Sequence, residues 1–230
     1  MRTAVKTISA ADIAATLEEE IALGLLAPRE RLVEEELSER FQVKRHVIRQ
    51  ALVDLHSMGI VVRHPNRGAT VRDYSATEVE QLYVVRTLVE TCAGKLIPLP
   101  AAPELLAELT RVHERHCEAV GRGDLRRVFR ENLLFHQTLF AASGNKSLTE
   151  VIEQLHFKTH AIRSYSIGNP KLLADVCQEH ASMIEYLRRG ERDAFVELLG
   201  KHIQPAKNAY LEQSRHKSVT QATRVGFHRT

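Results

Sequence analysis

The chain has 230 residues and a formal net charge of +3, and 43% of its residues are hydrophobic, 27% charged and 5% aromatic. This is the composition of a globular protein of one or two domains, and the charge is too mild to indicate nucleic acid by itself. No signal-peptide core and no run of eighteen apolar residues occurs, so we expect a cytoplasmic protein with no membrane span.

The N-terminal part of the chain, residues 1–73, has the pattern of a winged helix-turn-helix domain. Ser9 is a suitable cap for the first helix, and Gly59 ends the third. The expected elements are helices over 10–25, 34–41 and 44–55, strands over 60–62 and 69–71, and a turn at 65–68. Three helices followed by a two-strand wing is the order of a DNA-reading module.

Positive charge is concentrated in this domain. Residues 43–72 hold six Lys or Arg against the single acid Asp54, a local charge of +5, whereas residues 11–39 hold nine acids against two Arg, a charge of −7. A concentrated basic surface is what contact with phosphates requires, although a charge run is more often a solvated helix face. Because this run lies on the third helix and continues into the wing, DNA contact is the favoured interpretation.

Individual basic residues suggest particular contacts with DNA. Arg45 and Arg49 are four residues apart and share a helix face, so either is placed to reach guanine in the major groove while the other holds a phosphate. The alternative for Arg45 is an ion pair with an acid of the second helix, such as Glu39. At the wing, Arg67 is expected to reach the minor groove or backbone, with Gly68 allowing close approach. Weaker candidates for phosphate contact are Lys44 and His46.

These residues resemble the GntR family of bacterial transcription regulators, whose DNA-binding domain has the same order of elements. The resemblance rests on Leu32, Glu34, Leu37 and Phe41, on Val43, Arg45, Val47, Ile48, Arg49, Ala51 and Leu52, and on Asn66-Arg67-Gly68-Ala69 with Val71. The chain departs from the family at Arg29, Glu35, Lys44 and Val47, where Gly, Arg, Ser or Thr, and Pro are common. A glutamate at position 35 removes one DNA contact, and a lysine cannot cap a helix N-terminus through an acceptor.

After a short linker, the rest of the chain predicts an all-α antiparallel helical bundle over 74–212. Prolines and glycines separate the helices, and residues 213–230 are expected to form a disordered polar tail. The expected helices are 77–97, 104–120, 124–142, 146–165, 170–188 and 191–211. Three cysteines, Cys92, Cys117 and Cys177, lie far apart within these patterns, which favours reduced, mostly buried thiols over a disulfide framework.

Several histidines of the bundle suggest a metal site. Asn132 and His136 are four residues apart on an apolar helix face, and His180 and His202 lie in the middle of two other helices. Three imidazoles and an amide oxygen, converging from separate helices, suit a divalent transition metal. Spacing alone does not choose this set, because a helical histidine is more often a partly buried residue than a ligand. Other pairs with helical spacing are His156 with His160 and His113 with His116.

Residues 77–211 resemble the FCD domain that accompanies this DNA-binding module in the FadR-type subfamily. The resemblance rests on Arg86 and Glu90, on NLLFHQTLF before Ser143-Gly144-Asn145, on Glu179-His180, on Leu187, Gly190, Asp193 and Ala194, and on His202-Ile203. It implies a metal such as zinc or nickel on His136, His180 and His202, with Asn132 in place of the usual Asp. It also implies a small carboxylate effector near Arg86, for which the alternative is an exposed pair with Glu90.

Together these features predict a ligand-responsive transcription regulator, most often a repressor in such families, that is not an enzyme. We expect a homodimer on a palindromic operator, because one winged helix buries little DNA surface. A rival is a metal-dependent enzyme acting on a small organic acid, for which Glu131 and Glu179 are the evident general bases. A third interpretation is an interaction module that uses its winged helix for protein contacts.

Overall fold

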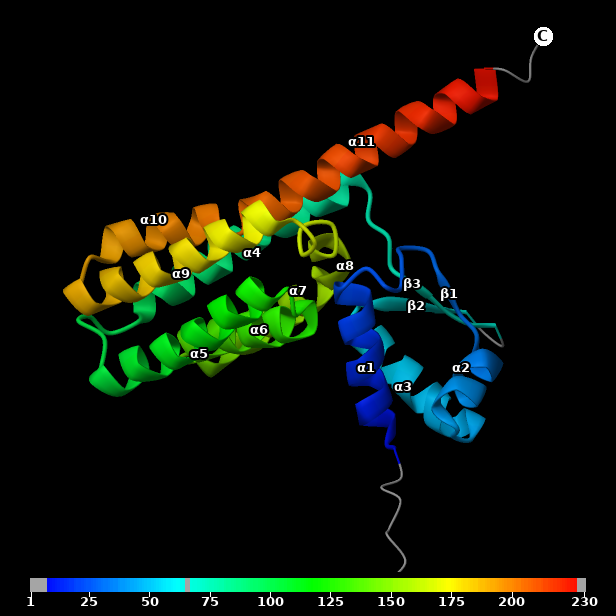
Figure 1. Cartoon of the computed structure of the whole chain (residues 1–230), viewed down its shortest axis with the longest axis horizontal. Helices are drawn as coiled ribbons and strands as arrows, with labels where there is room; N and C mark the ends of the chain where they lie inside the picture. Colours follow the sequence, from blue (N-terminus) through cyan, green and yellow to red (C-terminus); the bar gives the residue numbers. More distant parts are fainter. Residues whose placement is uncertain (1–7, 65–66, 227–230) are drawn as a thin grey trace, which may run out of the picture. The chain divides into compact units, whose positions relative to one another are not determined.

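The computed structural model describes residues 8–64 and 67–226, and the side chains among them as far as Arg215 (Figure 1). Two compact units divide the chain. The first contains residues 1–73 together with 156–161, and the second contains residues 74–155 and 162–230. The inclusion of 156–161 in the first unit has no counterpart in the predicted domains.

The first unit is a winged helix, as predicted. Its elements are α1 (Ala10–Ala22), β1 (Arg31–Leu32), α2 (Glu34–Phe41), α3 (Arg45–Ser57), β2 (Val61–His64) and β3 (Gly68–Val71). Ser9 caps α1 through a capping box with Asp12, as its sequence position predicted. The strand β1 was not predicted because it has only two residues. It completes an antiparallel sheet in the order β1-β3-β2, in which Arg31 lies opposite Thr70.

A small apolar core holds α1, α3 and the sheet together. One apolar face of α1 and one of the basic helix α3 are buried in this core, and Leu32, Val61 and Val71 cover them from the sheet. The core residues from the two helices are Ile13, Leu17, Ile21, Ile48, Ala51, Leu52 and Leu55. Burial of this face leaves the charged face of α3 directed away from the core.

A glycine is required where the wing meets β1. Gly68 has a φ of +81°, and a Cβ on it would lie 2.2 Å from the carbonyl oxygen of Leu32. The predicted wing turn also includes Pro65 and Asn66, which lie outside the described residues.

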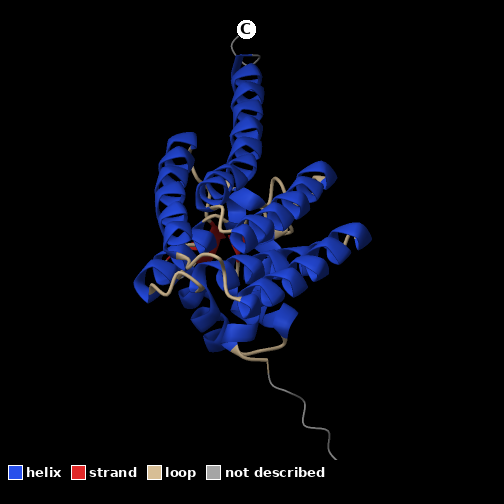
Figure 2. Ribbon diagram, turned by 90° about the vertical axis from the view of Figure 1, so that its left-hand side faces the viewer, coloured by secondary structure: helices blue, strands red, loops and turns tan. Residues whose placement is uncertain are grey.

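The second unit consists of helices throughout its described part (Figure 2). They are α4 (Ala76–Leu96), α5 (Pro103–Arg122), α6 (Leu125–Ala141), α7 (Lys146–Lys158, whose last residues belong to the first unit), α8 (His160–Arg163, whose start also belongs there), α9 (Pro170–Arg189), α10 (Arg192–His202) and α11 (Gln204–Gly226). Among these, α5 packs against α6 and α9, and α10 packs against α4 and α9. The predicted all-α architecture is confirmed.

Two predicted helices are each divided in the structure. The helix expected over 146–165 breaks at Thr159, whose backbone N–H donates to the carbonyl oxygen of His156, three residues earlier, at 3.0 Å, so that the last turn of α7 tightens and ends. The helix expected over 191–211 breaks at Ile203, because Pro205 lacks the N–H that an uninterrupted helix needs.

The C-terminal tail differs from its prediction. Helix α11 continues to Gly226, whereas residues 213–230 were expected to lack regular structure. Tyr210 and Leu211 are buried at its packed end, and the following residues contain no proline to stop the helix. Residues 227–230 lie outside the described part of the chain.

The core of the second unit is built mainly from α4, α5, α6, α9 and α10. Phe135, Leu139 and Phe195 are among its fully buried side chains. Cys92 is exposed, contrary to the prediction of buried thiols, and Cys117 and Cys177 are half-buried; all three are free. Among the described helices, none has the length and apolarity needed to cross a bilayer.

Candidate functional site

The two arginines of α3 project from the exposed face of the helix and are paired with acids of α2. Arg45 forms an ion pair with Glu35, and Nε of Arg49 lies 2.8 Å from Oε2 of Glu34. The arginine side chains are still 56% and 60% exposed. The expected alternative for Arg45, a pair with the second helix, therefore occurs with Glu35 rather than Glu39. The acids of α2 therefore neutralise part of the positive charge of α3.

These ion pairs are weak enough for DNA to displace. An exposed pair contributes about 0–1 kcal/mol, whereas a bidentate contact with guanine contributes about 1–3 kcal/mol. Lys44 and His46 are exposed beside Arg45 at the start of α3, and Lys44 makes no side-chain cap of the helix, as its lack of an acceptor predicted. The four basic residues thus share one end of the helix.

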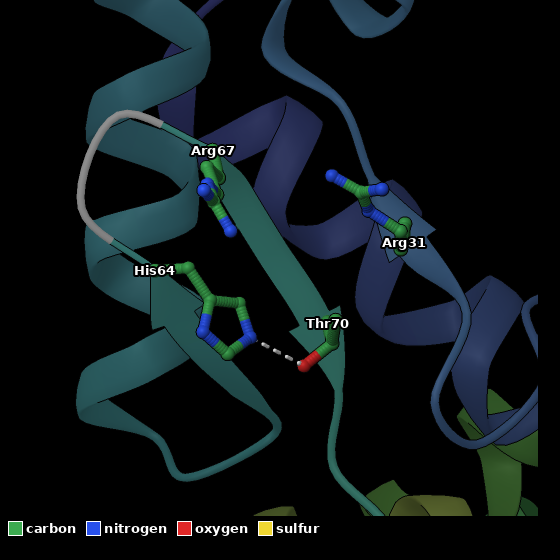
Figure 3. A pocket seen from close by; sticks show the side chains of 4 residues that line it. All are labelled: Arg31, His64, Arg67 and Thr70. Atoms are coloured by element: carbon green, nitrogen blue, oxygen red, sulfur yellow. Dashed lines mark hydrogen bonds between the residues drawn. The ribbon is translucent and has the colours of Figure 1, made fainter.

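The sheet and wing add a basic pocket. Arg31, His64, Arg67 and Thr70 line it, and Nε2 of His64 lies 3.0 Å from Oγ1 of Thr70 (Figure 3). Two guanidinium groups around one hollow suit a phosphate oxygen. Sequence reasoning missed Arg31, because the only signal was its place before the buried Leu32 in a two-residue strand.

Gly68 has a role in the fold of the wing, and its predicted role in the approach to DNA stays a prediction. It is buried and packs against the backbone of Leu32, where a side chain would not fit. Arg67, next to it, is exposed at the tip, where a DNA contact was predicted.

In the second unit, three histidines from three helices meet in the interior. His136 of α6, His180 of α9 and His202 of α10 are buried, and one ring nitrogen from each lies within 4.8 Å of the others. Nε2 of His202 lies 3.2 Å from Nε2 of His136. Two nitrogen ligands of one tetrahedral zinc ion are about 3.3 Å apart, since each bond is about 2.0–2.1 Å long. The three residues selected from the sequence therefore have a spacing that fits one metal ion.

His180 is fully buried, and both of its ring nitrogens are available for a metal ion. Its side chain is 0% exposed, and neither ring nitrogen has a hydrogen-bond partner. The ring of Phe135 stacks on it, with centroids 3.8 Å apart and an angle of 10° between planes, which fixes its orientation. Burial, together with the nearby His202 and His116, holds the pKa of His180 well below its usual value. The neutral ring keeps a lone pair available for a metal.

Asn132 lies one turn before His136 on the same face of α6. It is buried, and its Nδ2 atom has no hydrogen-bond partner. The same amide carries an oxygen, which is the atom that a divalent metal ion takes as a ligand.

Glu179 supports the histidine cluster from outside. Its Oε2 atom lies 2.5 Å from Nδ1 of His202. A carboxylate on the far nitrogen of a ligand histidine fixes its tautomer and raises its basicity. Glu179, which the enzyme interpretation used as a general base, is thus engaged in holding His202, and Glu131 is engaged with Arg115, with 2.9 Å between Nε and Oε1.

Arg86 is buried within the unit. Its Nε donates to Oε1 of Glu90 at 2.8 Å, the two side chains are 6% and 1% exposed, and the guanidinium lies 4.9 Å from the centre of the Tyr83 ring. The predicted alternative, an ion pair with Glu90 on the same helix, therefore occurs. The pair is buried, however, whereas an exposed pair was expected. Burial opposes the charge of Arg86, but Glu90 and Tyr83 outweigh it and raise the pKa of this arginine.

Arg163 is a second arginine beside this pair, and sequence reasoning missed it. Burial, and then the charge of Arg86, lower its pKa to about 10, while Tyr83 and Glu90 act in the opposite direction. Arg163 is half-buried and lies close enough to Arg86 and Glu90 to interact with both charges. The only sequence signal was a basic residue in the short stretch HAIRSY, inside a helix predicted to be continuous.

The other two histidine pairs named from the sequence are not part of the three-histidine cluster. His156 and His160 belong to the first unit, where Nε2 of His160 lies 2.9 Å from Oε1 of Glu18. His116 is buried in the second unit with its ring centroid 5.3 Å from that of His180. His113, its partner in the sequence pattern, is half-buried.

Comparison with known families matches both units. A family model described as "Bacterial regulatory proteins, gntR family" matches residues 9–71, and one described as "FCD domain" matches residues 81–205. The two matches correspond to the winged helix and to the helical domain that holds the histidine cluster.

Individual relatives are similar over most of the chain. The HTH-type transcriptional regulator McbR of Escherichia coli K12 is 25% identical over 181 residues, which are 77% of this chain and 81% of that protein. The HTH-type transcriptional repressor RspR of the same organism is 24% identical over 188 residues, 82% of each chain. The solved structure of E. coli McbR/YncC has the same fold, with a TM-score of 0.78 at 22% identity over 89% of this chain and 98% of that one.

Proposed function

The chain belongs to the GntR family of bacterial regulatory proteins and carries an FCD domain. We propose that it is a cytoplasmic, homodimeric transcription repressor. Its operator affinity responds to a small carboxylate held in a metal-containing pocket. The observation that carries the effector part is the buried cluster of His136, His180 and His202 in the helical domain.

The DNA-binding part of the proposal rests on the exposed basic residues of the first unit. Arg45 and Arg49 read bases in the major groove after releasing Glu35 and Glu34. Lys44 and His46 hold phosphates at the start of α3. The wing adds Arg67, and Arg31 from β1 joins it across the basic pocket.

The metal part of the proposal rests on four buried side chains that can act as metal ligands. His136, His180 and His202 would hold a divalent ion such as zinc or nickel, and Asn132 would offer its amide oxygen as a fourth ligand. The unpartnered nitrogens of His180 and the unpartnered amide of Asn132 fit this use, since buried polar groups without partners are costly. When bound, such an ion supplies a Lewis-acidic centre that attracts a carboxylate oxygen.

The carboxylate specificity of the pocket rests on charge. Arg163 and Arg86 together carry one more positive charge than Glu90 neutralises. An anionic effector would balance that excess, with Arg163 as a direct contact and Arg86 held in place by Glu90. For the effector to regulate, it must bind the DNA-competent and DNA-released forms with different affinity.

Enzymatic turnover is the less favoured alternative. The two acids available as general bases, Glu179 and Glu131, are occupied by His202 and Arg115. A regulator also explains the basic recognition face, which an enzyme would leave without a use.

The direct test measures operator retention. The full-length protein is bound to its palindromic operator, selected from random fragments, and titrated with a panel of mono- and dicarboxylates with and without chelator. We expect at least one carboxylate to release the operator, and the release to be lost in His180→Ala and in Arg163→Gln while DNA binding remains. Release that survives both substitutions, or turnover of the acid that is lost in His136→Ala, would refute the proposal.

A further inference from the structure

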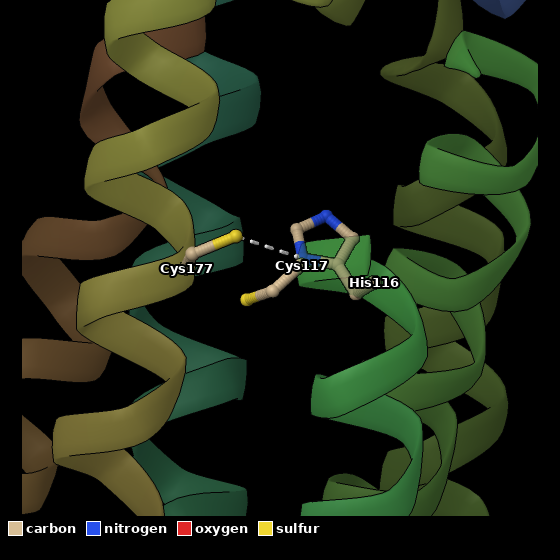
Figure 4. Close-up of side chains that lie close together, drawn as sticks. All are labelled: His116, Cys117 and Cys177. Carbon is tan, nitrogen blue, oxygen red and sulfur yellow. Dashed lines mark hydrogen bonds between the residues drawn. The ribbon is translucent and has the colours of Figure 1, made fainter. Parts of the chain in front are cut away.

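Three side chains outside the three-histidine cluster also converge between two helices. His116 and Cys117 lie on α5, and Cys177 lies on the facing helix α9. Figure 4 shows both sulfur atoms and the imidazole directed into the space between the helices. One ligand atom from each residue lies within 4.8 Å of the other two.

The separations match those of a mixed sulfur and nitrogen metal site. Sγ of Cys177 lies 3.6 Å from Nδ1 of His116. A sulfur and a nitrogen bound to one tetrahedral zinc ion are about 3.5–3.6 Å apart, given bonds of about 2.3 and 2.0–2.1 Å. Sγ of Cys117 in turn lies 3.6 Å from Nδ1 of His113, one turn earlier on α5. His113 is not among the residues whose ligand atoms all lie within 4.8 Å of one another, so the site is defined by the three converging side chains.

The protonation states suit metal binding better than redox chemistry. Burial and the neighbouring thiol of Cys117 raise the pKa of Cys177 to about 12, so its thiol is not a reactive nucleophile at neutral pH. Burial lowers the pKa of His116 to about 4, with contributions from His113 and His202, so its ring is neutral and has a free lone pair. A bound metal ion deprotonates a thiol ligand outright, whereas a peroxide sensor needs a thiolate already formed.

We propose that His116, Cys117 and Cys177 form a second metal site, selective for a thiophilic ion such as Zn(II). Two thiolates and imidazole suit soft or borderline ions, whereas the neighbouring set of three histidines and an amide has no sulfur. The two sets share no residue, although the rings of His116 and His180 are only 5.3 Å apart. The proposal does not depend on the proposed function.

The test uses cobalt(II) as the probe, because thiolate ligation gives it a near-ultraviolet charge-transfer band that histidine ligation does not. Reduced full-length protein is titrated with cobalt(II) and its absorbance recorded. We expect the band to saturate at one equivalent of thiolate-bound metal per chain and to be lost in Cys117→Ser and in Cys177→Ser. Cys92→Ser, at the exposed thiol of α4, is the matched control and should keep the band.

His136→Ala separates the two metal sites, since it damages the three-histidine set and should leave the thiolate band intact. No band in the reduced wild-type protein, a band unchanged in Cys177→Ser, or a band lost in Cys92→Ser or His136→Ala would each overturn the proposal. Because a serine variant can fail to fold, alkylation is also mapped in the wild-type chain with and without cadmium(II). Cadmium should slow the alkylation of Cys117 and Cys177 and leave that of Cys92 unchanged, and equal rates at all three would refute the site.

Discussion

Oε2 of Glu179 lies 2.5 Å from Nδ1 of His202, and this contact turns Nε2 of the same ring toward His136, 3.2 Å away. Glu179 lies on α9 and His202 on the neighbouring helix α10, so a carboxylate of one helix fixes the orientation of a metal ligand on the other. A histidine held in this way has one tautomer, with the proton on Nδ1 and the lone pair of Nε2 free for a metal.

Glu179→Gln should therefore weaken metal binding without removing a ligand. Loss of an outer carboxylate of this kind typically lowers metal affinity by about 10–100-fold. Competition with a chromophoric chelator measures the affinity in wild type and variant. Glu185→Gln removes the same charge from the same helix at an exposed position and should have no effect. Equal metal affinity in Glu179→Gln and wild type would contradict the assigned role.

The fold was largely predictable because its signals are local. Caps such as Ser9 and Asp124, and stops such as Gly59, Gly123 and Gly190, mark helix ends through backbone chemistry that neighbouring residues determine. The prediction failed where the helical pattern of the sequence continues past a residue at which the helix ends. The end of α7 is an example, because the backbone N–H of Thr159 bonds to His156 only three residues back and no periodicity indicates this tightening.

The sites were predictable only in part, because they depend on which residues meet across the fold. The family pattern selected His136, His180 and His202, and these do converge. Nothing in the spacing of Cys117 and Cys177, 60 positions apart in the sequence, indicated that they would lie together. Likewise, Glu35 was identified as a lost DNA contact, and its ion pair with Arg45 depends on how α2 packs against α3.

Removal of Arg86 should destabilise the helical domain through the charge it leaves behind. Arg86→Met removes the ion-pair partner of Glu90, whose side chain is 1% exposed, and breaking a buried pair in this way costs about 3–5 kcal/mol. Urea denaturation measures the free energy of unfolding. The double variant Arg86→Met, Glu90→Leu should recover most of the loss, because neither charge then remains buried. Additive losses in the double variant would show that the pair itself, rather than the charge left after its loss, provides the stability.

The metal-free protein should lose stability as the pH falls from about 6.5 toward 4. The pKa of His116 is lowered to about 4 in the folded chain, so in this window the unfolded state binds a proton that the folded state does not. Stability is therefore fully present above the unfolded pKa and falls by about 1.4 kcal/mol per pH unit for this group as the pH decreases. His180, whose pKa is also lowered, should add to the slope.

Urea denaturation between pH 7 and pH 5, with chelator present, checks this dependence. His116→Gln should show a smaller slope than wild type over that range, whereas His46→Gln, at an exposed position of α3, should not. Stability that is independent of pH in the wild-type chain would contradict the neutral, buried state of these rings.

Glu35→Gln should strengthen binding to the operator. The carboxylate of Glu35 competes with DNA for Arg45, and an exposed ion pair of this kind is worth about 0–1 kcal/mol, so its removal should tighten binding by up to about fivefold. Glu36→Gln removes an equal charge from the same helix and separates the loss of the specific pair from the general gain in positive charge. Fluorescence anisotropy on the operator and on a scrambled duplex measures both effects. A general charge effect would appear equally in the two variants and on both duplexes. Release of Arg45 should instead favour Glu35→Gln on the operator, and this preference should disappear when Arg45→Ala is added, because the arginine that the carboxylate restrained is then gone.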